Sequence, residues 1–229
     1  MLRRLPIARI TTSASTTGVS EGERLDGVVR ALEYKYERLL DIDLPFIVRL
    51  DGVSFRRLTA PLRKPFDPRF TAAMLQTAGA LMEALPMRTA FVQSDEITMV
   101  WCPERAGMAG SLPYGGRTQK MASVWAGLTS ALFNRHCSVH NVDSPGAIPA
   151  HFDARVFSVP DARTVGEVVM WRHAHDCRRN AVNAAGIAAF PHSELLGKSQ
   201  PQVIEMLRAK GLRFPEDYSP PAVYGAFFK

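Results

Sequence analysis

The chain has 229 residues, of which 46% are hydrophobic, so it can bury a core and is not disordered throughout. Its net charge of +6 favours anionic partners such as nucleotides or nucleic acid. Three scattered cysteines do not make a disulfide framework, and no apolar run approaches the roughly 20 residues of a membrane span. We therefore expect a cytoplasmic protein without a membrane partner.

The N-terminal part begins with a polar segment. Residues 1–20 hold three arginines and no acid, which predicts a flexible tail, with organellar targeting as the alternative. Between Glu21 and Asp41 apolar residues recur at steps of three and four, so an amphipathic helix is expected. The apolar run Leu44–Leu50 predicts a strand that ends at Asp51-Gly52, where a glycine lets a ligand approach the backbone.

A predicted hairpin carries two adjacent carboxylates. Two β-favouring runs in Phe91–Trp101 flank the polar tip Gln93-Ser94-Asp95-Glu96. The helix before it starts at Asp67-Pro68, with Asp67 as N-cap. In a ferredoxin-like β-α-β-β arrangement the first strand and the hairpin are neighbours, so Asp51 and Asp95 should face each other. Such a pair is typical of two-metal phosphoryl-transfer sites; a solvated turn is the alternative.

A basic helix start follows the hairpin. Tyr114-Gly115-Gly116 precedes a helix whose first turn carries Arg117 and Lys120 on one face. Together with the exposed amides of the helix start, these two side chains predict a phosphate clamp, although a solvated basic face explains the spacing equally well.

Six short segments occur in the order found in the tRNA(His) guanylyltransferase superfamily, which the sequence resembles from about Glu21 to its end. They are Arg49-Leu50-Asp51-Gly52 with Phe55, Lys64-Pro65 with Asp67, Gln93-Ser94-Asp95-Glu96, Tyr114-Gly115-Gly116-Arg117 with Lys120, Phe152-Asp153-Ala154-Arg155, and Trp171-Arg172 with Asp176-Cys177. The resemblance implies an α/β (α+β) fold with a ferredoxin-like, polymerase-type palm, antiparallel in its sheet and flanked by helices. The palm would span residues 21–160, after the tail and before a helical C-terminal part, residues 161–229.

The resemblance also implies roles for individual residues. The catalytic acids would be Asp51, Asp95 and Glu96. Two Mg²⁺ ions would be held by Asp51, Asp95 and the carbonyl of Gly52. Contacts to nucleotides and phosphates would come from Gly52, Val53, Ser54, Phe55, Lys64, Asp67, Ser94, Arg117 and Lys120. Contacts to RNA would come from Arg178, Arg179 and Asn180. The implied partners are tRNA, GTP, ATP and other nucleoside triphosphates, and a second copy of the chain, since the family forms tetramers.

The implied reaction is the addition of nucleotides to the 5′ end of tRNA in the 3′-to-5′ direction. Members dedicated to tRNA(His) carry His-Ile-Asn-Asn where this chain has Arg178-Arg179-Asn180-Ala181, and the spacing from Trp171 to Asp176-Cys177 is one residue longer here. The sequence is more similar to the Thg1-like proteins of bacteria and archaea, so we expect templated repair of 5′-truncated tRNAs. The alternatives are guanosine addition specific to tRNA(His), a palm-type nucleotidyl cyclase and a non-catalytic tRNA-binding protein.

Overall fold

The computed structural model describes residues 21–103, 112–142 and 149–229, and the chain divides into two units, residues 1–38 and 39–229. The first unit contains helix α1 (Glu21–Tyr34), which ends earlier than the predicted Asp41. Leu39, which was expected in that helix, instead forms a β-bridge with Arg117 in the second unit. The predicted tail lies outside the described residues. Among those described, no helix is long and apolar enough to span a membrane.

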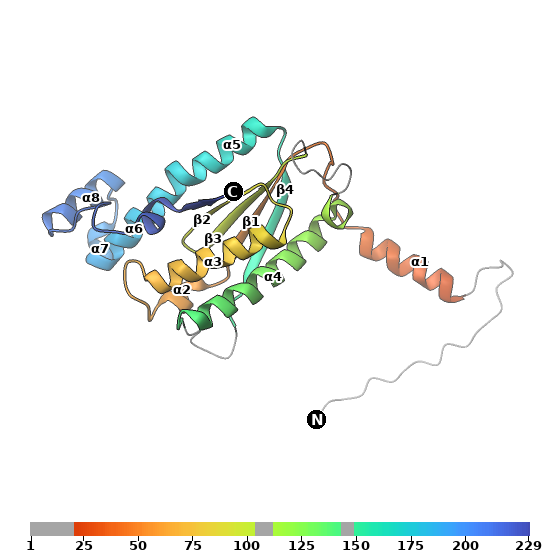
Figure 1. The fold of residues 1–229 in the computed structure, drawn as a ribbon, viewed down its shortest axis with the longest axis horizontal. Helices are drawn as coiled ribbons and strands as arrows, with labels where there is room; N and C mark the ends of the chain where they lie inside the picture. Colours follow the sequence, from red (N-terminus) through yellow and green to blue (C-terminus); the bar gives the residue numbers. More distant parts are fainter. Residues whose placement is uncertain (1–20, 104–111, 143–148) are drawn as a thin grey trace, which may run out of the picture. The chain divides into compact units, whose positions relative to one another are not determined.

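The second unit follows a β-α-β-β-α-β order with a C-terminal extension (Figure 1). Its elements are β1 (Phe46–Gly52), α2 (Phe55–Thr59), α3 (Pro68–Ala84), β2 (Thr89–Gln93), β3 (Glu96–Trp101), a short turn (Pro113–Gly116), α4 (Thr118–Val139), β4 (Phe152–Ser158), α5 (Ala162–Trp171), a π-helical turn (Arg172–Cys177), α6 (Arg178–Ala189), α7 (His192–Leu195), α8 (Gln200–Ala209), α9 (Pro220–Tyr224) and β5 (Ala226–Phe228).

The sheet has the strand order β4-β1-β3-β2-β5, and every neighbouring pair is antiparallel. This order confirms the predicted ferredoxin-like fold class, with β1 and β3 as adjacent central strands. The C-terminal part is not purely helical, because its last strand, β5, pairs with β2 and extends the sheet.

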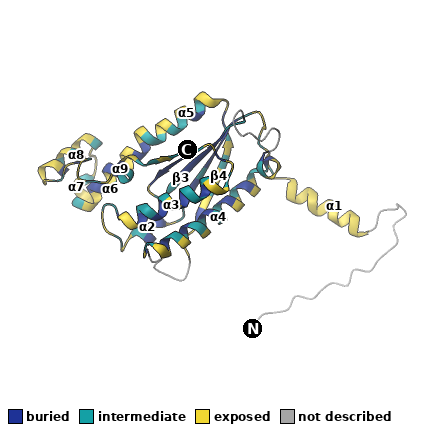
Figure 2. Ribbon diagram, in the orientation of Figure 1, coloured by how far each residue is buried: buried dark blue, intermediate teal, exposed yellow. Residues whose placement is uncertain are grey.

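The two faces of the sheet have different environments. Alternation along β1 turns Phe46, Val48 and Leu50 toward α3 and α4, where the main core lies (Figure 2). On the opposite face Ile47 packs in a smaller cluster beneath α5. Further along β1, Asp51 lies on this second face, beyond the apolar contacts of α5. The alternation therefore separates the core from the polar side chains that form the candidate site.

Asp67 caps α3, as predicted. Its carboxylate accepts hydrogen bonds from the backbone amides of Arg63 (3.1 Å) and Arg69 (2.9 Å) and forms an ion pair with the Arg69 guanidinium (2.8 Å). The hydrogen bond from the Arg69 side chain is the main reason that the pKa of Asp67 lies well below its usual range. Both carboxylate oxygens are thus engaged within the protein, which explains Asp67 through helix capping, while its contact with a nucleotide stays a prediction.

Candidate active site

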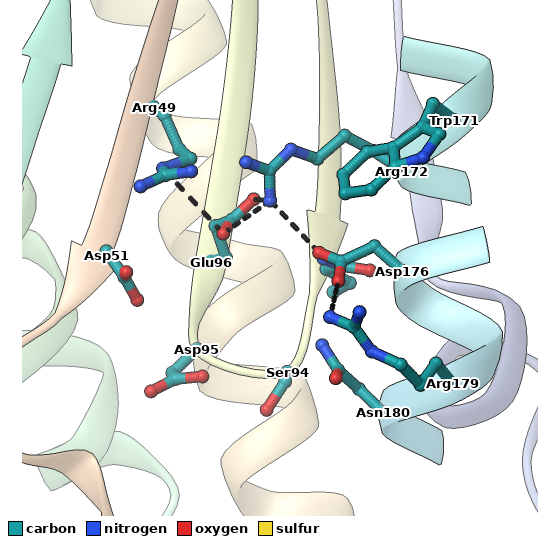
Figure 3. A pocket seen from close by; sticks show the side chains of 11 residues that line it. Arg49, Asp51, Ser94, Asp95, Glu96, Trp171, Arg172, Asp176, Arg179 and Asn180 are labelled. Atoms are coloured by element: carbon teal, nitrogen blue, oxygen red, sulfur yellow. Dashed lines mark hydrogen bonds and ion pairs between the residues drawn. The ribbon is translucent and has the colours of Figure 1, made fainter. Parts of the chain in front are cut away.

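Two carboxylates meet at the edge where β1 ends and the β2–β3 hairpin turns. The amide of Gly52 donates a hydrogen bond to the backbone carbonyl of Asp95 (3.1 Å), which fixes the hairpin tip beside the end of β1. In the β1–β3 ladder Asp51 lies opposite Glu96, not opposite Asp95, which occupies the turn itself. Figure 3 shows the Asp51 and Asp95 carboxylates pointing into the same space. The predicted pair is therefore present, with Asp95 one residue outside the ladder.

The two carboxylates share an unfavourable electrostatic environment. Burial raises the pKa of Asp95 above its ordinary value, and the charge of Asp51 raises it further, against hydrogen bonds from its own amide and the Ser94 hydroxyl. Burial likewise raises the pKa of Asp51, and the negative charge of Asp153, its partner across the β1–β4 ladder, adds to the shift. A cation placed between Asp51 and Asp95 would relieve this repulsion.

The turn that presents Asp95 is held in an uncommon conformation. Ser94 has a φ of 49°, in the left-handed region that a non-glycine residue adopts at a cost. Gly52, the last residue of β1, is fixed by packing against the core. A Cβ on Gly52 would lie 2.5 Å from the ring of Phe55, so this glycine is required by the packing of Phe55. The space beside the Gly52 Cα is thus filled by the buried ring of Phe55, and the approach of a ligand to the Gly52 backbone stays a prediction.

Glu96 is committed to arginines rather than to the space in front of Asp51 and Asp95. Nη1 of Arg172 donates to both of its carboxylate oxygens (2.5 and 2.8 Å), and Arg49 lies 3.9 Å away. Burial raises the pKa of Glu96, and the charges of Arg172 and Arg49 oppose that shift. These contacts turn the Glu96 carboxylate away from the other two acids (Figure 3). The structure therefore supports a positioning role for Glu96.

The network continues into the C-terminal part. Nη1 of Arg172 also donates to Asp176 (3.1 Å), which accepts further hydrogen bonds from Gln93 (2.9 Å) and from Arg179. The side chains of Arg172, Glu96 and Asp176 are only 12%, 13% and 9% exposed, so these charges interact in a poorly hydrated environment. The π-helical turn and β3 are thereby joined by charge-assisted bonds across 76 positions of sequence.

Two cavities adjoin at this place. The smaller, about 410 Å³, is the acidic pocket, lined by the acids and the arginines of this network together with Trp171 and Asn180 (Figure 3). The larger, about 1030 Å³, is a groove between the 56–67 segment, the start of α3 and α6. The residues that line both cavities are Gln93, Ser94 and Asn180. A ligand can thus reach from the groove to the acids.

The predicted RNA-binding segment (residues 178–180) and Lys64 contribute to the walls of these cavities. All three residues of the segment, Arg178, Arg179 and Asn180, are exposed, and the last two line the acidic pocket. Lys64 lines the groove, where its Nζ donates to the carbonyl of Thr59 (2.5 Å). Val53 and Ser54 form the turn that leads from β1 into α2, with the Val53 amide bonded to the His151 carbonyl (2.9 Å).

Arg117 and Lys120 are not brought to the acids within one chain. They start α4, whose Trp125 stacks on Phe46, the first residue of β1 (ring centroids 6.3 Å). Asp51 lies at the other end of β1, so the rise per residue along the strand and the helix separates the basic pair from the acids by roughly 20 Å or more. Arg117 bonds the carbonyl of Tyr114 (3.3 Å), and the Lys120 ammonium lies 5.6 Å from the centre of the Tyr114 ring. Within one chain the basic pair therefore lies too far from Asp51 and Asp95 to hold a phosphate there, and its phosphate-binding role stays a prediction.

Sequence reasoning assigned no role to several residues that shape the pocket. Arg49, Arg172 and Asp176 stood in the quoted motifs, and Gln93 precedes the two acids, but their contacts join distant segments. A polar side chain inside an otherwise apolar central strand, as Arg49 is in Phe46–Gly52, was the available indication that this part of the sheet is not core.

Comparison with known proteins agrees with this geometry. The family model described as tRNA(His) guanylyltransferase matches residues 26–160. An uncharacterized protein of Acanthamoeba polyphaga mimivirus is 28% identical over 197 residues, which cover 78% of this chain and 68% of that protein. A Mus musculus protein named probable tRNA(His) guanylyltransferase is 28% identical over 166 residues, 69% of this chain, and the chain spans only about half (53%) of its length.

Solved structures show the same fold. A bacterial tRNA(His) guanylyltransferase-like protein in complex with ATP matches with a TM-score of 0.80 and 26% identity, covering 89% of this chain and 85% of that one. A bacterial protein of the same description in complex with GTP matches with a TM-score of 0.66 and 28% identity, covering 73% and 78%. The tRNA(His) guanylyltransferase of Saccharomyces cerevisiae, at 17% identity and a TM-score of 0.73, covers 89% and 92% and supports the fold alone.

The Arg172 network predicts a stability effect. Arg172→Ala leaves two buried carboxylates without their shared cation and should lower the free energy of unfolding by about 3 kcal/mol or more. Arg163→Ala is the matched control, because it removes an ion pair to Glu167 whose arginine is 86% exposed, and it should cost less than about 0.5 kcal/mol. Urea denaturation measures both variants, and equal losses would contradict the role given to Arg172.

Proposed function

Because the chain belongs to the tRNA(His) guanylyltransferase family, a family of nucleotidyltransferases, we propose that it adds nucleotides to the 5′ end of tRNA in the 3′-to-5′ direction. The observation that carries this proposal is the pairing of Asp51 and Asp95 beside a groove large enough for a nucleoside. Two similar solved structures are complexes with ATP and with GTP, which supports nucleoside triphosphates as the small substrates here.

The acidic pocket fits magnesium. Mg²⁺ is held by one or two carboxylates together with substrate phosphates and water, and Asp51 and Asp95 supply such a pair, each with a pKa that burial raises. Within the described residues no group of three or more His, Cys, Asp or Glu side chains is arranged to hold a metal ion. Phosphate oxygens, water and the Gly52 carbonyl would therefore complete the coordination of the two ions that we propose.

In the proposed reaction, the 3′-hydroxyl of the incoming nucleotide attacks the α-phosphorus of an activated tRNA 5′ end. A new phosphodiester bond forms, and pyrophosphate leaves from a 5′-triphosphate, or AMP from an adenylylated end. Magnesium, when bound, lowers the pKa of the attacking hydroxyl and offsets phosphate charge. Asp51 and Asp95 position the reactants, and Arg49 and Arg172 supply positive charge from the wall of the same pocket.

We further propose that the substrates are 5′-truncated tRNAs. Arg179 and Asn180 lie at the pocket, where a cationic side chain contributes contacts to any RNA backbone rather than to one anticodon. A nucleotidyl cyclase would use the same two acids but has no need of an RNA surface. A non-catalytic tRNA-binding protein would have no use for two carboxylates held together against their repulsion.

A homo-oligomer would reconcile the positions of the basic pair and the acids. Arg117 and Lys120 lie too far from Asp51 and Asp95 of their own chain to contact a phosphate there. We propose that the basic pair of one copy serves the acidic pocket of another, as expected for a family that forms tetramers.

Removal of Asp95 tests the metal assignment. Asp95→Asn should reduce nucleotide addition at least roughly 10²-fold and should abolish the rise in melting temperature on addition of Mg²⁺. Removal of Mg²⁺ with a chelator should stop the wild-type reaction reversibly. Asp161→Asn, at an exposed helix cap, is the control and should keep normal activity. Normal turnover by the Asp95 variant would remove it from the metal site.

A choice between two RNAs tests the substrate. With labelled GTP, the wild-type chain should extend a 5′-truncated tRNA in preference to full-length tRNA(His) that lacks its additional 5′ guanosine. Gel analysis of the 5′ ends gives the two rates. Equal rates, or a preference for tRNA(His), would instead favour guanosine addition specific to that tRNA.

Mixed subunits test the shared site. Arg117→Ala and Asp95→Asn should each be nearly inactive, but co-expressed chains should regain activity where Asp95 of one copy meets Arg117 of another. If both residues serve the same chain's pocket, every mixed site carries a defect and activity stays lost. Near-normal turnover by Arg117→Ala alone would assign the basic pair to a solvated face.

A further inference from the structure

Gln93, the last residue of β2, has one polar atom that the protein leaves without a partner. The residue is 4% exposed, and its Nε2 donates a hydrogen bond to Asp176 (2.9 Å). Within the described part of the chain its Oε1 is buried and accepts no hydrogen bond. A buried acceptor without a donor costs free energy, and because Gln93 lines both cavities, this acceptor points to a donor brought by a ligand.

The orientation of this amide is set by its neighbour. Asp176 accepts hydrogen bonds from Arg172 and Arg179 as well as from Gln93, so it is held as a carboxylate that only accepts. The amide nitrogen of Gln93 must therefore face Asp176, and the carbonyl oxygen must face away from it. The hydrogen-bond partners therefore determine which end of the Gln93 amide is the oxygen, and the unpartnered atom is an acceptor.

The position of Gln93 indicates which part of a nucleotide it meets. With Ser94 and Asn180 it lines both the acidic pocket and the groove. Phe66, Phe70 and Met74 give the groove an apolar wall suited to a base. The reactive 3′-hydroxyl has to reach the acids. The sugar, which joins the two parts, therefore lies at the junction of the cavities.

We infer that Oε1 of Gln93 accepts a hydrogen bond from the ribose 2′-hydroxyl of the incoming nucleotide and so selects ribonucleotides over deoxyribonucleotides. The inference rests on the proposed function. The 3′-hydroxyl is engaged in the reaction, whereas the adjacent 2′-hydroxyl is a free donor on the same edge of the sugar. A 2′-deoxynucleotide leaves the acceptor buried and unsatisfied, which should weaken binding roughly 10-fold or more.

Equilibrium binding to the full chain in Mg²⁺, without tRNA, tests this role. The wild-type protein should bind GTP at least roughly 10-fold more tightly than 2′-deoxyGTP, and ATP over 2′-deoxyATP by a similar factor, since the sugar and not the base is read. Gln93→Met, of similar volume but with only a weakly accepting sulfur in place of the amide oxygen, should bring both ratios close to one.

Arg179→Ala is the matched control, because it removes another hydrogen bond to Asp176 but keeps the carboxylate that holds Nε2, and so leaves Oε1 in place; it should keep the ribose preference even where overall affinity falls. Gln93→Leu is a second variant if the methionine protein does not fold. A wild-type protein without a ribose preference overturns the inference alone, as does a preference that survives in both Gln93 variants. A wild-type protein that binds neither GTP nor ATP overturns the proposed function together with the inference.

Discussion

Two carboxylates of like charge are held together at the end of strands β1 and β3, and the rest of the site is arranged around that constraint. The ladder sets Asp51 opposite Glu96, and the bond from the Gly52 amide to the Asp95 carbonyl closes the tip against β1. Burial raises the pKa of both aspartates, because their charged forms are less well solvated in the folded chain than in water. Sites of this kind trade stability for function.

The positive charge that lowers the pKa of Asp51 against its burial comes from Arg49 on β1 and from Arg172 in a distant part of the chain. Arg172 binds Glu96 on β3 and Asp176 on its own turn, so the C-terminal part and the sheet complete one pocket between them. The C-terminal strand β5 strengthens this connection by pairing with β2 and by placing Phe227 against Phe91 (ring centroids 4.7 Å). The pocket therefore depends on the C-terminal part as much as on the strands that carry the acids.

How far the site could be predicted differs from residue to residue. Asp51 and Asp95 could be paired from sequence because a strand, a helix and a hairpin with clear periodicities determine which strands are neighbours. The distance of Arg117 and Lys120 from the acids could not be predicted, because helical spacing shows which face of the helix they share but not at which end of the sheet that helix begins. Strand β3 runs away from the hairpin tip, and the next helix, α4, begins at the end of the sheet opposite the acids. Arg172 and Glu96 could not be paired from any local pattern, since their contact depends on how the C-terminal part packs.

The π-helical turn has a consequence for how related chains are compared. One additional residue in a regular α-helix would rotate everything after it by about 100°, which would carry Arg179 and Asn180 away from the pocket. The turn Arg172–Cys177 lies where this chain's motif is one residue longer, and a wider turn accommodates a residue without passing the rotation on. An added residue at this position therefore changes the length of the sequence without changing the direction in which the side chains of α6 point. Two relatives can differ by a gap in alignment and still present the same helical face to the pocket.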